Sequence, residues 1–239
     1  MIRTAIIAAM PGELKPLVRG WHHKRRNRVD LWRWRFDGEW IAACAGAGQN
    51  AATRALAEVE KDGPVASVVS IGWAGALSET FQHGQAYRVS GVVDILTGER
   101  FRTAPSSPDL WLATSPKVAD AAEKQRLATA YRAGLVDMEA AAIARLAAMR
   151  GIAFHCIKGV SDGFTDRLPD FNRFLTSEGR FQLARFTLFA LFHPGYWPAL
   201  KQMGENSKKA SLNMAESVLD LLDPQGTIRK RNGYPNLSR

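Results

Sequence analysis

The stretch that decides the fold reads LVDMEAAAIA over residues 135–144, and an apolar run that ends in KGVSD at residues 158–162 follows it. The first stretch is typical of a short strand leading into an alanine-rich helix, and the second predicts a buried strand from Ile152 to Val160. Glu139 is therefore expected at a helix N-terminus, and Asp162 at the C-terminal end of a strand. Ligands of open α/β sheets bind at the carboxyl ends of the strands, so both carboxylates are candidates for chemistry.

The rest of the chain continues this alternation of strands and helices, which predicts a single α/β domain over residues 1–222. Apolar runs at 2–9 and 65–71 predict buried parallel strands. Apolar spacing predicts one helix over 171–192 and a second, amphipathic helix from Trp197 to Leu222. Residues 223–239 are expected to form a basic, disordered tail.

Composition narrows the class of protein. The chain has 239 residues and is 46% hydrophobic, which is enough for one sizeable core. It contains neither an apolar run of about 18 residues nor a signal-peptide pattern at its start. Cys44 and Cys156 each lie in an apolar run without metal-ligand spacing, so we expect reduced cysteines in a cytoplasmic protein.

The charge of the chain is +9, which favours anionic partners such as nucleic acid, phosphates or an acidic membrane. A soluble enzyme with a basic face explains it equally well. A charged loop over 19–28 is expected to precede a hairpin, 29–36 and 40–45, that turns at Asp37-Gly38 and has Trp32, Trp34 and Phe36 on one face. That face could stack on bases or lie among lipid headgroups, but packing on the core is the preferred interpretation. No nucleic-acid motif accompanies the charge, so no nucleic-acid partner is expected.

Two glycine-containing turns follow strands, AGAGQN at 45–50 and GWAGA at 72–76. Gly48, Gly72 and Trp73 are candidates for close backbone approach to a ligand. The spacing matches neither a dinucleotide-binding fingerprint nor a P-loop. Glu13 follows a Met10-Pro11-Gly12 turn, and a carboxylate there is commonly only a partner of the helix dipole.

Five motifs follow one another along the chain: IIAAM with Glu13, AGAG at 45–48, IGWAGAL at 71–77, VDMEAAA at 136–142 and GVSD at 159–162. Together and in this order they resemble the purine nucleoside phosphorylase superfamily. The resemblance is strongest to the methylthioadenosine/S-adenosylhomocysteine nucleosidases. It implies a three-layer α/β/α domain around a mixed, partly barrel-like sheet, here with extra C-terminal helices. It also implies a homo-oligomer that cleaves the N-ribosidic bond of an adenine nucleoside without metal or organic cofactor.

The resemblance also implies a role for each matching residue. Asp162 would protonate the purine at N7, with Ser161 orienting it, and an apolar setting would raise the pKa of this acid. Glu139 would bind the ribose hydroxyls and Met138 would pack on the sugar. Glu13 would activate water.

Two departures bear on the nucleophile. Trp73 stands where the family has serine or threonine, and Ser70 stands where hexameric phosphorylases have a phosphate-binding arginine. Both departures favour water over phosphate. The alternatives are a phosphate-dependent phosphorylase, a methylthioadenosine/S-adenosylhomocysteine nucleosidase, and a nucleoside-binding protein in which Trp73 closes the nucleophile site.

The added C-terminal part resembles a hopanoid-associated branch, implicated in removing adenine from adenosylhopane, a lipid-linked nucleoside. A peripheral membrane contact fits this substrate, through Trp21, Trp32, Trp34 and Trp197 and through a helix that carries Lys201, Lys208 and Lys209. The preferred alternative is that this helix packs on the sheet or on a partner subunit.

Overall fold

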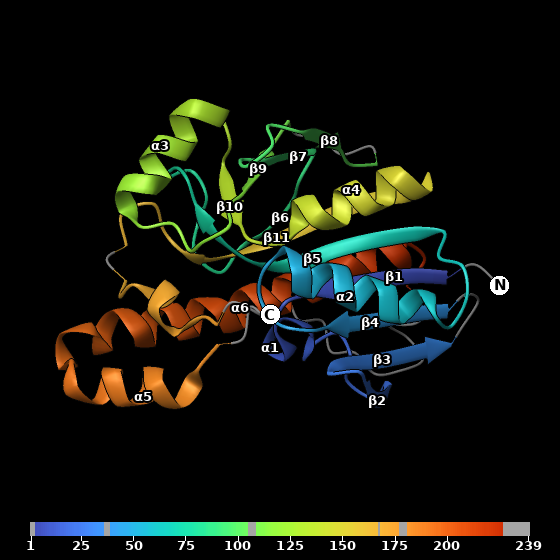
Figure 1. The fold of residues 1–239 in the computed structure, drawn as a ribbon, viewed down its shortest axis with the longest axis horizontal. Coiled ribbons are helices and arrows are strands. Elements are labelled where there is room, and N and C mark those ends of the chain that lie inside the picture. Colours follow the sequence, from blue (N-terminus) through green and yellow to red (C-terminus); the bar gives the residue numbers. More distant parts are fainter. Residues whose placement is uncertain (1–2, 36–38, 105–108, 167, 177–180, 227–239) are drawn as a thin grey trace.

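An open mixed sheet runs through the molecule, and strand β5 lies at its centre (Figure 1). The structure is a computed structural model that describes residues 3–35, 39–104, 109–166, 168–176 and 181–226. Within these residues β5 pairs in parallel with β1 and β11, and its last residues pair antiparallel with β10. The strands are β1 Arg3–Ala8, β2 His22–Arg26, β3 Val29–Arg35, β4 Glu39–Cys44, β5 Ser67–Ala76, β6 Ala86–Arg88, β7 Gly91–Asp94, β8 Arg100–Arg102, β9 Trp111–Thr114, β10 Leu135–Asp137 and β11 Ala153–Asp162.

Helices cover both faces of this sheet, which confirms the predicted α/β architecture. Helices α2 and α4 pack on one face, and α1 and α6 pack on the other, while α3 covers the part of the sheet formed by β7, β9 and β10. The helices are α1 Pro11–Leu14, α2 Gln49–Glu60, α3 Ala121–Tyr131, α4 Ala140–Arg150, α5 Leu183–Phe192 and α6 Trp197–Leu222, with short 3-10 helices η1 Phe171–Phe174 and η2 Pro194–Tyr196.

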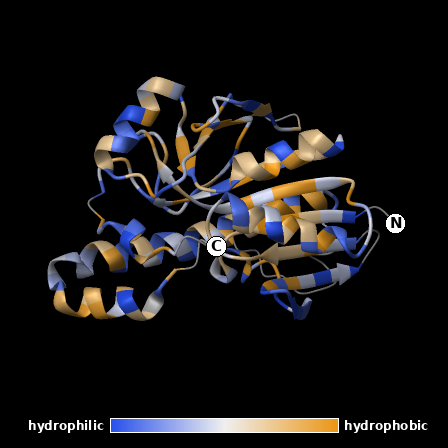
Figure 2. Cartoon of the chain, viewed as in Figure 1, coloured by the Kyte–Doolittle hydropathy of each residue, from blue (hydrophilic) through white to orange (hydrophobic). Residues whose placement is uncertain are grey.

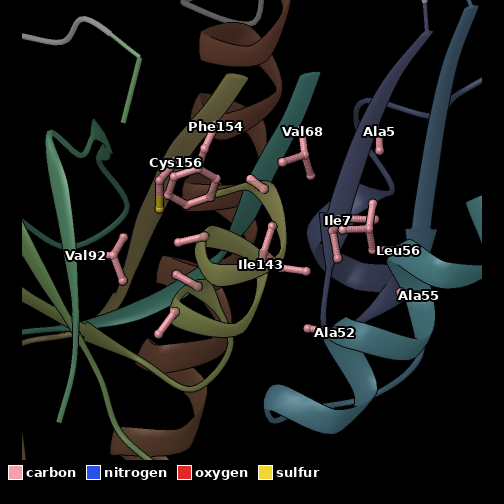
Figure 3. Close-up of a cluster of buried hydrophobic side chains, with 14 of the residues drawn as sticks. Ala5, Ile7, Ala52, Ala55, Leu56, Val68, Val92, Ile143, Phe154 and Cys156 are labelled. Atoms are coloured by element: carbon pink, nitrogen blue, oxygen red, sulfur yellow. The ribbon is translucent and has the colours of Figure 1, made fainter. Parts of the chain in front are cut away.

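The core under α2 and α4 consists of small and branched side chains (Figure 3). Alanine is the best helix former and leaves no bulk between helix and sheet, so α4 lies close to Phe154 and Cys156 of β11. The helix ends at Gly151, whose φ of 64° suits a glycine after the last helical residue. Cys44 and Cys156 are buried free thiols.

Helix α6 lies on the opposite face because its apolar side chains recur at helical spacing, with Ala210, Met214 and Val218 buried. Gly159 of β11 makes this approach possible. A Cβ at Gly159 would come within 2.8 Å of the Cβ of Ala210, so any larger residue there would push the helix away.

Two segments differ from the prediction. Residues His22–Arg26 form an edge strand instead of a loop, because Arg26 is held by ion pairs to Glu58 and Asp62 at 2.8 and 2.9 Å. The helix predicted over 171–192 is interrupted, and only η1 and α5 are helical among its described residues. Its phenylalanines pack against one another instead of along one continuous helix, and a β-bridge joins Leu175 to Phe181.

The tryptophans of the hairpin belong to the core and do not form an exposed aromatic surface. Trp21 is buried, with its ring 6.2 Å from those of Trp34 and Trp40, and Trp32 and Trp34 pack on the same cluster as α6. Phe36, the turn at Asp37-Gly38 and most of the basic tail, 227–239, lie outside the described residues. Across the part of the chain that is described, no helix combines the length and the apolar character needed to cross a bilayer.

Candidate functional site

The carboxyl ends of β1, β5, β10 and β11 border a single cavity of about 1320 Å³. Its lining includes six of the residues expected from the sequence: Glu13, Trp73, Met138, Glu139, Ser161 and Asp162. Gly48 and Gly72, the other two, lie directly behind this lining and contact its carboxylates. The fold therefore brings together residues that are up to 149 positions apart in the chain.

Glu13 is a buried carboxylate held by three backbone N–H groups. Those of Ala9 and Met10 donate to Oε2 at 2.8 Å, and that of Trp73 donates to Oε1 at 2.9 Å. Burial raises the pKa of Glu13 above its ordinary value, although these hydrogen bonds and the ammonium of Lys158 act in the opposite direction. Gly72 makes room for this arrangement, because a Cβ there would lie 3.1 Å from Glu13 Oε1.

Glu139 is the residue that precedes α4. Its side chain makes no capping hydrogen bond to the helix, and its Oε1 accepts the backbone N–H of Gly48 at 2.6 Å. Burial, followed by the charge of Asp137, raises the pKa of Glu139 to about 8. Near neutral pH this carboxyl is therefore mostly protonated, and it can both donate and accept hydrogen bonds. Such a group suits a pair of neighbouring hydroxyls.

The raised pKa of Glu139 makes the stability of the protein depend on pH. The folded state keeps the proton up to about pH 8 and the unfolded state loses it near pH 4.5, so stability falls as the pH rises through this window. The expected slope from this group is at most about 1.4 kcal/mol per pH unit. In Glu139→Gln, the free energy of unfolding measured in urea should fall less steeply between pH 5 and 8 than in wild type. Equal slopes in Glu139→Gln, wild type and the exposed control Glu205→Gln would contradict the assignment.

A buried ion pair lies next to Glu139. Lys158 Nζ is 2.9 Å from Asp137 Oδ2, and both side chains are fully shielded from solvent. Thr114 Oγ1 and the backbone N–H of Ala140 also donate to Asp137, at 2.7 and 2.9 Å. Burial acts to lower the pKa of Lys158, but Asp137 and other neighbours raise it above its ordinary value, so the side chain stays a cation.

Asp162 lies at the end of β11, beside a bulge. Val160 pairs with Ala74 and Asp162 with Gly75, so Ser161 is the extra residue. Ser161 Oγ donates to Asp162 Oδ1 at 2.6 Å, and Lys124 Nζ lies 2.5 Å from Oδ2. The surroundings of Asp162 are thus polar and include a cation, whereas the sequence predicted an apolar setting.

Trp73 points its indole toward α6. Its Nε1 donates to Ser207 O and to Ser211 Oγ, both at 3.0 Å, and its ring lies over Gly12. The side chain therefore forms part of the cavity wall, while its backbone N–H holds Glu13. Met138 is a half-buried part of the lining beside Glu139.

A second part of the cavity lining consists of apolar side chains, although Ser207, Lys208 and Ser211 of α6 also line the cavity. Helix η1, the residues around it, α5 and α6 supply this part of the lining, which we call the apolar end: Leu168, Phe171, Leu175, Phe181, Phe186, Leu200, Met203 and Leu212. Sites for small molecules usually enclose about 300–1,000 Å³, so this cavity exceeds the usual range.

Three charged residues of the site escaped the sequence analysis: Asp137, Lys158 and Lys124. A lysine inside an apolar strand demands a buried counter-charge, and this signal could have identified Lys158. Lys124 lies on α3, and no local sequence pattern marks it as a site residue. Among the described residues no three His, Cys, Asp or Glu side chains converge as metal ligands.

Comparison with protein families gives one match, to the model described as the phosphorylase superfamily, over residues 3–125 and 97–190. Together these segments cover more than half of the chain. Comparison with curated proteins gives no match.

Several solved structures share the fold. The chain is similar to the S-adenosylhomocysteine nucleosidase of Streptococcus pyogenes, with 17% identity, a TM-score of 0.71, and 93% and 97% of the two chains covered. It is also similar to two Helicobacter pylori proteins, 5′-methylthioadenosine/S-adenosylhomocysteine nucleosidase and futalosine hydrolase, each with 14% identity, a TM-score of 0.70, and 93% and 98% covered. At these identities the likeness shows the fold alone.

Proposed function

Because this chain belongs to the phosphorylase superfamily, we propose that it hydrolyses the N-ribosidic bond of an adenine nucleoside with a long apolar 5′ substituent, such as a lipid-linked nucleoside. The observation that carries this proposal is the division of one cavity into a carboxylate end, with Glu13, Glu139 and Asp162, and an apolar end. The first end suits a purine riboside and the second suits a hydrocarbon. The structures named above are of proteins titled as nucleosidases or as a hydrolase, which supports the reaction type.

In the proposed mechanism the ammonium of Lys124 passes a proton to Asp162, and Asp162 gives it to N7 of adenine, which makes the base a better leaving group. The C1′–N9 bond then breaks and its electron pair leaves with adenine. Ser161 and Lys124 fix the two oxygens of Asp162, and Lys124 is a proton donor in direct contact with it. A positioned acid of this kind contributes about 10²–10⁴-fold to a rate.

The sugar that remains has oxocarbenium character at C1′, and the carboxylates of Glu13 and Asp162 stabilise it. Glu139 binds the ribose hydroxyls. Water adds to C1′ and gives its proton to Glu13, whose raised pKa brings it closer to neutral pH and makes it a better base. Water is the favoured nucleophile because Ser70, whose hydroxyl accepts from Lys158 at 3.3 Å, is neutral and supplies no cation for phosphate.

The test is adenine release, followed by chromatography, from methylthioadenosine, adenosine and an adenosine with a long 5′-alkyl chain, each with and without phosphate. Release without phosphate, fastest from the alkyl substrate, is the expected result. Preference for methylthioadenosine would make the protein a nucleosidase for small substrates. Dependence on phosphate would make it a phosphorylase, and binding without release would make it a binding protein.

A polar substitution in the apolar end should separate these substrates. Met203→Asn removes the contact of a thioether side chain with the alkyl chain, and burial of such a side chain is worth about 1.5–3 kcal/mol. We therefore expect kcat/KM for the alkyl substrate to fall by about 10–100-fold, and that for methylthioadenosine to change little. Met149→Asn, at an exposed methionine of α4, is the matched control. An equal loss for both substrates would show that Met203 acts on the fold and not on the substituent.

A further inference from the structure

Exposed apolar side chains concentrate on one part of the surface. Among the described residues six large hydrophobic side chains are exposed, and four of them lie between residues 188 and 197. We call this group the docking face: Leu188, Leu191, Phe192 and Trp197, which are 52–72% exposed. Figure 2 shows the hydrophobic character of α5 at the lower left of the molecule.

The docking face is one side of α5 and the start of α6. Leu188, Leu191 and Phe192 are spaced three and four residues apart, so they share one face of the helix. The opposite face packs inward, where Phe186 and Phe189 lie 5.4 and 5.3 Å from the ring of Phe174. The inward side chains hold α5 in place, and the outward ones are mostly exposed.

Trp197 is held against the C-terminal part of α5. Its Nε1 donates to the backbone oxygen of Ala190 at 2.7 Å, so the indole stays next to α5 although it is exposed. A ring with an apolar body and a satisfied polar edge is typical of tryptophan at the level of lipid headgroups.

Basic side chains outnumber carboxylates around the docking face. From Asp170 to Glu205 the described residues include three exposed basic side chains, Arg173, Arg185 and Lys201, and two exposed carboxylates, Asp170 and Glu205, the second of which lies 4.0 Å from Lys201 Nζ. The whole chain carries +9. An apolar patch with basic surroundings matches the interface of an anionic bilayer, where each Lys or Arg contributes about 1 kcal/mol.

A second copy of the chain fits this surface less well. A two-fold interface would bring the same patch of two subunits together, and the basic side chains of both copies would then lie in one interface. We propose that the docking face lies on an anionic lipid bilayer, with Leu188, Leu191, Phe192 and Trp197 among the headgroups. Helices α5 and α6 also supply Phe186, Leu200 and Met203 to the apolar end of the cavity, so the bilayer would be the source of the apolar substrate; this last step rests on the proposed function.

The experiment is sedimentation of the full chain with vesicles of phosphatidylcholine alone and of phosphatidylcholine with phosphatidylglycerol. Wild type should bind the anionic vesicles, and the variant Leu188→Ser/Leu191→Ser/Phe192→Ser should bind them at least tenfold more weakly. The matched control is Leu96→Ser/Met149→Ser, which changes the two other large side chains with similar exposure and should bind as wild type does. Circular dichroism verifies that each variant is folded.

A second variant tests the charges. Arg173→Gln/Arg185→Gln/Lys201→Gln should weaken binding to anionic vesicles roughly 100-fold and make the remaining binding less dependent on salt. No binding by wild type, or equal binding by all variants, would overturn the proposal. Analytical ultracentrifugation tests the alternative of a second copy. If wild type and the other variants form dimers and only the Leu188→Ser/Leu191→Ser/Phe192→Ser variant is monomeric, the docking face binds a second copy instead of a bilayer.

Adenine release from a water-soluble nucleoside separates this proposal from the proposed function. If the protein releases adenine but does not bind vesicles, the proposal for the docking face is wrong and the proposed reaction is retained. If the protein binds vesicles but cleaves no nucleoside, the proposal for the docking face is retained and the proposed reaction is wrong.

Discussion

An Asp162→Asn variant is expected to release adenine about 10²–10⁴-fold more slowly than wild type. Asparagine has the same shape but no acidic proton, so N7 of the departing base stays unprotonated. Ser161 Oγ can still donate to the amide oxygen, but the amide nitrogen then faces Lys124 Nζ, so the ion pair is lost and a lower melting temperature is expected. Chromatographic measurement of kcat, with the melting temperature recorded in parallel, tests both statements.

The matched control for this variant is Asp170→Asn. Asp170 caps η1 by accepting the backbone N–H of Asn172 at 3.0 Å, and asparagine caps a helix as well as aspartate does. This control should keep the wild-type rate. Retained turnover in Asp162→Asn would refute the role of Asp162 as the acid, whereas equal losses in both variants would point to a disturbed loop.

The second large effect concerns stability. Lys158→Met should lower the free energy of unfolding by about 3–5 kcal/mol, because it leaves the Asp137 carboxylate buried without its cation. It should also lower activity, since the ammonium of Lys158 acts on the pKa values of both Glu13 and Glu139. Urea unfolding at pH 7 measures the first effect and adenine release the second.

Two further variants isolate the cause. Lys158→Met/Asp137→Asn removes both charges and should recover part of the lost stability, even if the single variant is too unstable to purify. Lys201→Met, at a lysine that is 81% exposed, should change stability by less than about 0.5 kcal/mol. If the free energy of unfolding of Lys158→Met is within 1 kcal/mol of the wild-type value, the ion pair does not stabilise the fold as described.

Local sequence patterns predicted the helices and strands whose residues have a clear apolar periodicity. The alanine-rich helix after Glu139 and the apolar strand before Asp162 follow from side-chain periodicity, and the structure contains both as α4 and β11. Because parallel strands end at the same edge of a sheet, the convergence of Glu13 and Asp162 on one cavity could also be predicted. This reasoning does not place Glu139, because it follows β10, which is antiparallel to β5.

Other features depend on contacts that no local pattern records. Lys124 reaches Asp162 across 38 positions of sequence, from a helix whose own pattern gives no hint of a site. The phenylalanines between 171 and 192 have helical spacing, but they pack on one another and interrupt the expected helix. Trp21 is buried against Trp34 and Trp40, although its neighbours in sequence are charged.

Helix α5 packs against the two short 3-10 helices η1 and η2, and its two faces have different neighbours. Phe186 on its inner face lines the cavity, while Leu188 on its outer face is exposed. A ligand inside and a contact outside therefore act on one ten-residue element. Thermodynamic linkage then requires reciprocity: if occupation of the cavity strengthens the outer contact by some factor, the outer contact strengthens occupation of the cavity by the same factor.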